Sequence, residues 1–271
     1  MYYNRSNRRD DRTALPVDRQ DGILRATHLL SMSDSLKIVR HELWSYADTQ
    51  KASFFPRFFK TKQGEYGYGD QFIGVTVPQV RKVALKCSTL SEKDVIDLLQ
   101  SPIHEERLLS LLILVTRFQK GNDEIKKHIA SLYLKHIKWV NNWDLVDSSA
   151  DKILGAYSKD HGTDILFTFA RSKDLWRRRI AIVATYHYIK QGDATLALEI
   201  ATILKDDTHD LIQKAVGWML REVGKRCGKE KEELFLNLYA ATMPRTMLRY
   251  SLEHFSPEKR EYYMNLGKKR I

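Results

Sequence analysis

Cysteine is scarce in this chain of 271 residues, which contains only Cys87 and Cys227. The two lie far apart and neither belongs to a CxxC pair, so the sequence offers no disulfide framework and no zinc knuckle. Free thiols fit a reducing compartment. We therefore expect a cytoplasmic protein.

Long apolar runs are also lacking. The longest apolar stretch, around residues 108–115, is too short to cross a bilayer, and no early segment resembles a signal peptide. The nine histidines show no HExxH pattern and no metal-ligand spacing, so we expect neither a metal nor another cofactor. Ser148 and Ser149 lack a nucleophile-elbow pattern, which disfavours a hydrolase triad.

Positive charge is abundant. The chain has 45 Lys plus Arg against 34 Asp plus Glu, and its formal net charge of +11 favours polyanionic partners, nucleic acid before membrane. Residues 1–33 mix arginine with aspartate and show no apolar periodicity. We interpret them as a mobile basic arm that precedes a domain over residues 34–271.

From Asp34 onward the sequence is amphipathic at helical period and contains no convincing alternating run, which predicts an all-α fold. Stops are expected at Gly121, Gly155, Gly192 and Gly228. Helices are expected to begin near Asp34, Pro78, Ser91, His104, Asp123, Trp143, Asp164, Leu175, Ala194, His209, Glu230 and Pro244, and after Pro257.

Between Ser91 and Phe255 the expected helices form pairs that recur at roughly 30 to 40 residues, the period of a helical solenoid. Stacked pairs form a curved array with a concave surface lined by the second helix of each pair. The glycine-rich segment 64–70 is not a nucleotide-binding loop, because no strand precedes it and its spacing is wrong. We interpret it as a flexible lead-in to the helix near Pro78.

Trp143 and Asp147 lie one helical turn apart, at the border of the face that should enter the core. An indole beside a carboxylate at such a border is a plausible reaction centre. The alternative is that neither residue has a catalytic role. A Trp at a helix start often serves only packing, and an Asp in the first turn often serves only to stabilise the helix through its dipole.

Trp218 lies about 110° from the centre of the apolar stripe of its helix. Its neighbours on that side are Lys214, Arg221 and Lys225. Cations around an aromatic ring suit a nucleic-acid surface, where phosphates supply affinity and the ring meets a base or sugar. A cation–π pair, or packing onto a neighbouring repeat, explains the same pattern.

Arg177, Arg178 and Arg179 stand at the start of a helix, where the macrodipole disfavours positive charge. An anion should compensate. Asp147 of the preceding repeat could form an ion pair with Arg179, or a bound phosphate could meet the guanidinium groups. The sequence alone does not decide between these two partners for Arg179.

Four segments together resemble the AlkD family of DNA alkylation-repair glycosylases. The match spans about residues 35–265, and the motifs occur in order on the expected helices. They are GDQFIGV at 69–75, NWDLVD at 142–147, WRRRIA at 176–181 and KAVGWMLRE at 214–222. Two departures are the basic arm and Asn142, which replaces an aromatic residue found in some members.

The resemblance implies a curved, right-handed α-solenoid of HEAT-like repeats that acts as a monomer on duplex DNA. The implied activity is hydrolysis of the N-glycosidic bond of N3- or N7-alkylated purines, without a deep base pocket. The resemblance maps the catalytic site onto Asp147, Trp143, Trp218 and Arg179. No lysine stands in the NWDLVD motif at 142–147 as a Schiff-base nucleophile, so a monofunctional enzyme is expected.

A DNA-binding face is expected from cations on the second helices of successive repeats: Arg177, Arg178, Lys214, Arg221, Lys225, Arg245 and Arg249. The alternative function is a non-catalytic helical-repeat scaffold for nucleic acid or protein, because solenoids commonly serve as scaffolds. Retention of the four mapped site residues favours the enzyme.

Overall fold

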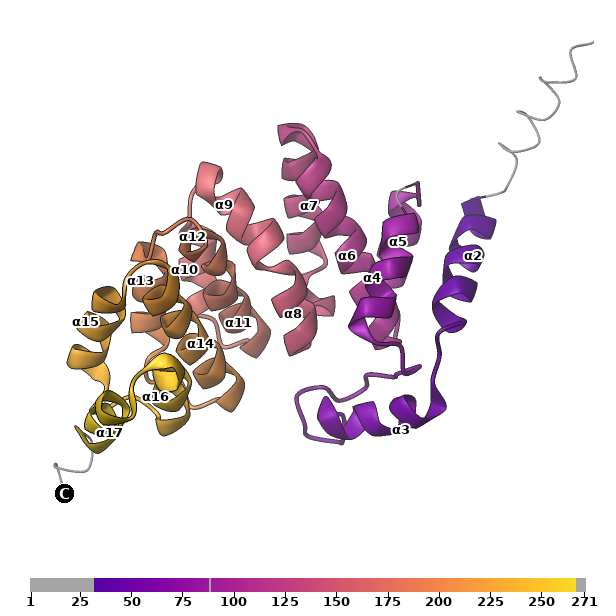
Figure 1. Ribbon diagram of the computed structural model, residues 1–271. Helices are drawn as coiled ribbons and strands as arrows, with labels where there is room; N and C mark the ends of the chain where they lie inside the picture. Colours follow the sequence, from indigo (N-terminus) through magenta and orange to yellow (C-terminus); the bar gives the residue numbers. More distant parts are fainter. Residues whose placement is uncertain (1–31, 88, 267–271) are drawn as a thin grey trace, which may run out of the picture.

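The computed structural model describes residues 32–87 and 89–266, and the residues in these ranges confirm the all-α prediction (Figure 1). The expected basic arm lies outside the described residues, apart from its last two positions. The helical elements are α2 (Met32–Trp44), α3 (Thr49–Phe58), α4 (Val77–Lys86), α5 (Glu92–Leu99), α6 (His104–Lys120), α7 (Asp123–Lys135), η1 (Ile137–Trp139), α8 (Trp143–Ser149), η2 (Asp151–Gly155), α9 (Ala156–His161), α10 (Asp164–Ala170), α11 (Leu175–Ala184), α12 (Tyr186–Ile189), α13 (Thr195–Leu204), α14 (Asp210–Arg226), α15 (Lys229–Tyr239), α16 (Arg245–Ser251), η3 (Leu252–His254) and α17 (Pro257–Leu266).

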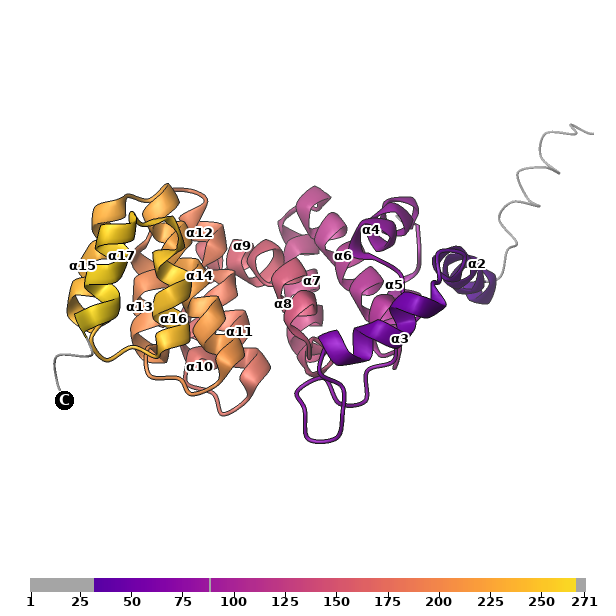
Figure 2. The same cartoon turned by 60° about the horizontal axis from the view of Figure 1, so that its bottom comes forward.

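The helices stand side by side in a row, with α2 at one end and α17 at the other (Figures 1 and 2). Helix α6 packs against α4, α5, α7 and α8, and α14 packs against α11, α13, α15 and α16. Helix α3 departs from the row and lies across the lower ends of its neighbours in Figure 1. It therefore reaches the region where α6 and α8 begin.

Side-chain caps fix several of the expected helix starts. Asn122 accepts a hydrogen bond from the N–H of Ile125 (3.0 Å) to open α7. Asp174 accepts from the N–H groups of Trp176 (2.8 Å) and Arg177 (2.9 Å) to open α11. Such caps satisfy backbone donors that a helix leaves unpaired at its first turn, which explains why local sequence predicted these positions well.

Helix α3 was not expected. Its N-cap is Asp48, whose carboxylate accepts from the N–H of Lys51 (3.0 Å). Phe54 and Phe58 of this helix remain exposed, and Pro56 lies within it. Apolar residues on the outside obscure the amphipathic pattern by which a helix is recognised.

The predicted stop at Gly155 is wrong. The chain continues from α8 through the π-helix η2 into α9, and the run ends at Gly162, whose φ of 91° is left-handed. Gly155 itself is helical, and a Cβ there would lie 2.2 Å from the carbonyl oxygen of Ala184. The glycine thus permits close approach of α11 instead of ending the helix.

The longest apolar stretch of the sequence forms the buried centre of the row. All residues from His104 to Val115 of α6 are buried. The apolar members join one core cluster that extends from Leu36 to Tyr263. None of the helices formed by residues 32–87 and 89–266 has the length and apolarity needed to cross a lipid bilayer.

Candidate functional site

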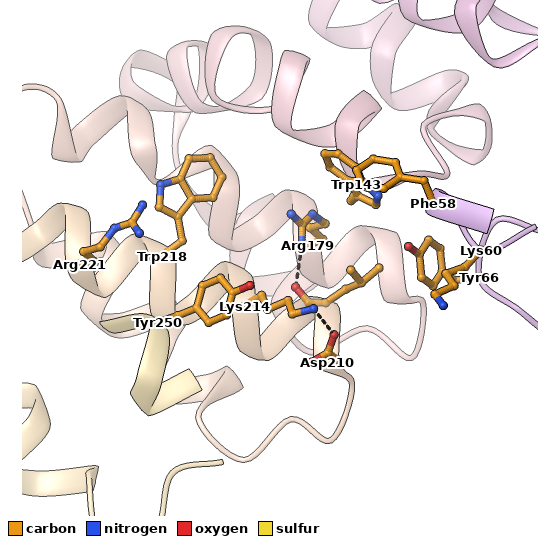
Figure 3. A pocket seen from close by; sticks show the side chains of 11 residues that line it. Phe58, Lys60, Tyr66, Trp143, Arg179, Asp210, Lys214, Trp218, Arg221 and Tyr250 are labelled. Atoms are coloured by element: carbon orange, nitrogen blue, oxygen red, sulfur yellow. Dashed lines mark hydrogen bonds and ion pairs between the residues drawn. The ribbon is translucent and has the colours of Figure 1, made fainter. Parts of the chain in front are cut away.

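Two cavities meet at the side chains of Phe58 and Trp143, which line both of them. The larger cavity has a volume of about 550 Å³. Its lining comes from α3, α8, α11, α14, α16 and the segment after α3, and comprises Phe58, Lys60, Tyr66, Trp143, Arg179, Asp210, Leu211, Lys214, Trp218, Arg221 and Tyr250 (Figure 3).

The larger cavity brings together five residues that the sequence singled out: Trp143, Arg179, Lys214, Trp218 and Arg221. In Figure 3, Trp143 lies at one side, Trp218 and Arg221 lie at the other, and Arg179 lies between them. These residues come from α8, α11 and α14, the second helices of successive expected pairs. Five of the residues expected on the second helices therefore line one cavity.

The two indoles are held differently. Trp143 stacks on Phe59, with ring centroids 5.3 Å apart and an interplanar angle of 17°, and meets Phe58 edge-on at 5.7 Å. Trp218 is half-buried and contacts the ring of Tyr186 at 5.8 Å. Each indole therefore packs against a ring and also lines the larger cavity; for Trp218 the packing partner is Tyr186.

Asp147 forms a bidentate ion pair with Arg179. The Nε and Nη2 atoms of Arg179 donate to the two carboxylate oxygens at 3.0 and 2.8 Å, and Nη1 donates to the carbonyl of Leu211 at 2.6 Å. Burial raises the pKa of Asp147 above its ordinary value, against the opposing charge of Arg179. Of the two partners considered for Arg179, the structure therefore contains the carboxylate.

This ion pair also joins the two cavities, because Arg179 lines the larger one and Asp147 lines the smaller one. The Asp147 side chain remains 21% exposed, whereas that of Arg179 is 6% exposed. A buried guanidinium thus orients a carboxylate that a ligand can still reach.

The start of α8 is anchored by a buried network of charged groups. Protonated His104 donates from Nδ1 to Asp70 (2.9 Å) and from Nε2 to Asp144 (2.7 Å). Arg107 donates to the second oxygen of Asp70 at 2.5 Å. Asn142 caps α8 through the N–H of Trp143 (2.8 Å) and donates to Asp70 (3.0 Å). Asn142 is therefore a structural link in this network.

Burial alone would lower the pKa of His104, but the charge of Asp144 and the hydrogen bonds to Asp144 and Asp70 raise it to about 9. Two carboxylates and two cations, His104 and Arg107, thus balance each other inside the protein. Such a network is rigid because loss of any one member leaves its partners buried and unpaired.

The next residue, Glu105, holds the segment that leads into α4. Its carboxylate accepts from the N–H groups of Ile73 (3.2 Å), Gly74 (2.8 Å) and Val75 (3.2 Å). Gly74 has a φ of 82°, and a Cβ there would lie 2.1 Å from the carbonyl oxygen of Asp48. The stretch between the glycine-rich segment 64–70 and α4 is therefore fixed by Glu105.

The smaller cavity has a volume of about 350 Å³ and lies among the same anchored elements. Aromatic side chains and carboxylates dominate its wall, which consists of Phe55, Phe58, Phe59, Phe72, Val75, Thr76, Val77, His104, Glu105, Leu108, Trp143, Asp144, Asp147 and Ser148. Within the part of the chain that the structure describes, no three His, Cys, Asp or Glu side chains are grouped to hold a metal ion.

The remaining predicted DNA contacts line neither cavity. Arg178 is engaged in a structural pair with Asp207 (2.7 Å), and Arg177 lies exposed over the ring of Phe169 at 5.6 Å. Arg245 donates to the carbonyl of Met264 (2.7 Å). Lys225 and Arg249 are exposed, Lys225 beside a third, smaller hollow.

Several site residues escaped the sequence analysis. Phe58, Lys60 and Tyr66 come from the unexpected helix and the glycine-rich segment after it. Two local features do mark this region: the aromatic run at 54–59, and four consecutive polar residues, 104–107, at the start of the helix that contains the longest apolar stretch. Polar residues at the buried start of a helix need partners, and these partners lie at the site.

Comparisons with known proteins agree with this picture. The family model described as DNA alkylation repair enzyme matches residues 39–255. A solved structure described as a predicted DNA alkylation repair enzyme from Enterococcus faecalis has a similar fold, with a TM-score of 0.60 and 16% identity, over 78% of this chain and 97% of that one. The comparison with curated proteins gives no match.

Proposed function

Because the chain belongs to the DNA alkylation repair enzyme family, we propose that it is a monofunctional DNA glycosylase. Its substrates are positively charged N3- and N7-alkylated purines in duplex DNA. The observation that supports this most directly is the Asp147–Arg179 ion pair, placed beside Trp143 where the two cavities meet. The row of helix pairs is, in this proposal, a right-handed HEAT-like solenoid that binds DNA as a monomer.

The larger cavity suits the DNA backbone. Its wall contains the cations Lys60, Arg179, Lys214 and Arg221, and the single carboxylate among its described lining residues is Asp210. Lys214 pairs with Asp210 at 2.6 Å, and Arg221 pairs with Glu253. These pairs are partly exposed and therefore weak, so a phosphate can displace the carboxylates.

The chemistry depends on the charge of the lesion. Alkylation at N3 or N7 makes the purine a cationic leaving group that needs little help from a general acid. As the glycosidic bond breaks, the deoxyribose acquires oxocarbenium character, which the carboxylate of Asp147 stabilises while it positions the attacking water.

The size of this effect follows from Coulomb's law. A unit pair about 4 Å apart at an effective dielectric near 20 is worth roughly 4 kcal/mol, on the order of a thousandfold in rate. The positive charge of Arg179 offsets part of this stabilisation. We therefore expect Asp147→Asn to lose at least roughly tenfold in excision rate.

The decisive experiment is single-turnover release of 7-methylguanine from a duplex with one lesion, by wild type and Asp147→Asn. Asp151→Asn is the matched control, because Asp151 is a buried carboxylate of the same helical run that pairs with Lys152 and Lys190 at 2.8 Å and lines neither cavity. The control should excise normally if folded.

A duplex with one uracil tests the charge argument, since uracil is neutral and should remain in place. Full activity of folded Asp147→Asn would remove the catalytic assignment. Duplex binding without release of any alkylated base by the wild type would favour the non-catalytic scaffold.

A further inference from the structure

A third cavity lies between α14, α15 and η3, and the proposed reaction does not use it. Its volume is about 200 Å³. Its wall consists of Arg221, Gly224, Lys225, Lys229, Glu232, His254 and Phe255. Arg221 also lines the larger cavity, at the side that carries Trp218 (Figure 3). The third cavity therefore continues the positive wall of the larger one along α14.

The cations of the third cavity are available to a ligand. Lys225 and Lys229 are exposed, and Lys229 lies over the ring of Phe255 at 4.7 Å. Within residues 32–87 and 89–266, no hydrogen bond or ion pair joins either lysine to a carboxylate. Arg221 pairs with Glu253 at the edge of the cavity. Lysines without carboxylate partners around one hollow favour an anion as its ligand.

One acidic side chain lies among these cations without pairing with any of them. Glu232 is 3% exposed, and neither of its carboxyl oxygens forms a hydrogen bond or ion pair with a described residue. Its Oε1 is enclosed by protein, whereas its Oε2 lies against Gly224, where a Cβ would collide with it. The glycine thus provides the space for a carboxyl group in the cavity wall. An unpaired buried charge is costly, so this environment favours the neutral acid.

The titration of Glu232 agrees with its surroundings. Burial raises its pKa to about 8, and the nearby charge of Glu233 acts in the same direction, against the opposing charges of Lys229 and Arg221. The group is therefore mostly neutral at pH 7. A neutral carboxyl group differs from a carboxylate because it has an O–H that can donate a hydrogen bond.

We propose that the third cavity binds a backbone phosphate of the duplex, which accepts from Lys225, Lys229 and the neutral carboxyl group of Glu232. The cavity is smaller than typical small-molecule pockets, which fits a single phosphate group. This inference rests on the proposed function, because it takes the anion from DNA. Since Arg221 borders both cavities, this phosphate lies further along the duplex than those in the larger cavity.

The arrangement makes DNA affinity depend on pH. When Glu232 loses its proton, the cavity gains a negative charge and loses a donor, and both changes oppose phosphate binding. Protonation and phosphate binding therefore favour each other. Duplex affinity should be greatest below pH 8 and should fall as pH rises through that value.

The test compares wild type with Glu232→Gln, which has the same shape, stays neutral and keeps a donor at every pH. Anisotropy of a rhodamine-labelled, undamaged duplex gives the affinity at pH 7 and pH 9, at constant ionic strength. The two proteins should bind about equally at pH 7, and wild type should bind about fivefold more weakly than Glu232→Gln at pH 9. Equal affinities at both pH values would overturn the proposal.

Glu233→Gln is the matched control. It removes the same charge one residue away, and Glu233 pairs with Lys259 at 2.5 Å and does not line the third cavity. This variant should lose affinity with pH as wild type does. The charged and titratable groups around Glu232, whose contributions cancel in these comparisons, are Arg221 and Lys225 of α14, Lys229 and Glu233 of α15, and Glu253 and His254 of η3.

A second variant tests the same cavity without changing a buried group. Lys225 is exposed, so Lys225→Ala should fold normally. At pH 7 it should reduce the slope of log affinity against log salt by about one unit. It should also shrink the loss of affinity between pH 7 and pH 9. An unchanged slope would contradict a phosphate contact in the third cavity.

Two further measurements separate the source of the phosphate and the proposed reaction. Sulfate keeps its charge between pH 7 and pH 9; sulfate binding that weakens with pH, in a protein whose duplex affinity does not, would identify a free-anion site and contradict the backbone assignment. Excision of 7-methylguanine is measured separately. Excision by a wild type whose duplex affinity shows no dependence on Glu232 would refute this inference and leave the glycosylase proposal intact. The expected pH dependence in a protein that releases no base would support the phosphate site and refute the glycosylase proposal.

Discussion

The two ends of the larger cavity are built in different ways. The end formed by α3 and the start of α8 rests on a buried charged network, in which His104, Asp70 and Arg107 are each at most 3% exposed. The end formed by α14 and α16 presents cations in partly exposed pairs, such as Lys214 with Asp210. The first end holds its side chains in a fixed geometry. At the second end, the cations can exchange their carboxylate partners for DNA phosphates. The difference suggests that substitutions at the first end act on stability and function together.

The largest expected effect is on stability at the first end. His104→Ala should lower the free energy of unfolding by about 3–5 kcal/mol, because it leaves two buried carboxylates without their shared cation. The measurement is urea-induced unfolding at pH 7.

His128→Ala is the matched control for this prediction. His128 is exposed and pairs with Glu92 at 2.5 Å, so its loss should cost about 1 kcal/mol or less. A similar cost for both variants would show that the network is not what holds α8.

The same network predicts a pH dependence. The pKa of His104 is raised from 6.5 to about 9, so its stabilisation is fully present below pH 6.5 and is lost as pH rises through 9. The full effect corresponds to about 3 kcal/mol. It is measured as the difference in unfolding free energy between wild type and His104→Gln at pH 6, 8 and 10, because other titrating groups cancel in that difference. A constant difference would contradict the prediction.

Excision by the two indole variants compares the two ends directly. Trp143→Ala and Trp218→Ala should each lose about 1–2 kcal/mol of cation–π contact, or about five- to thirtyfold in rate. Both variants should also destabilise the fold, since Trp143 stacks on buried Phe59 and half-buried Trp218 packs against the core and the ring of Tyr186. Trp44 is 48% exposed and lines neither cavity, so Trp44→Ala should excise normally. Stability of both variants equal to that of Trp44→Ala would contradict the packing role of the two indoles.

The smallest expected effect is on the salt dependence of DNA binding, to which Lys214 and Arg221 of the second end should contribute. If Lys214 and Arg221 contact phosphate, replacement of either by Ala should reduce the slope of log affinity against log salt by about one unit. Fluorescence anisotropy of a labelled duplex between low and moderate salt measures this slope. Lys86 pairs with Glu42 and lines neither cavity, so Lys86→Ala should leave the slope unchanged. Affinity that does not depend on salt would contradict the phosphate assignment for the larger cavity.

Local sequence determined the helices well. The periodicity of apolar residues predicts most helix starts, and the caps at Asn122 and Asp174 stabilise two of them, because a cap acts within its own first turn. Where a position depends on distant packing, local reasoning failed. Gly155 was taken as a helix stop, yet its missing side chain serves the approach of α11. Helix α3 is not predicted because two of its aromatic residues, Phe54 and Phe58, remain exposed, which obscures the amphipathic pattern.

The sequence by itself also determined the net charge and the candidate site residues, namely the motif around Trp143 and Asp147 and the cations around Trp218. Only the tertiary structure decided what they do to one another. Asp147 meets Arg179 across 32 residues, and His104 meets Asp70 and Asp144 across 34 and 40. Charge and periodicity are properties of a segment, whereas burial, a shifted pKa and a cavity arise only where segments distant in sequence are packed together.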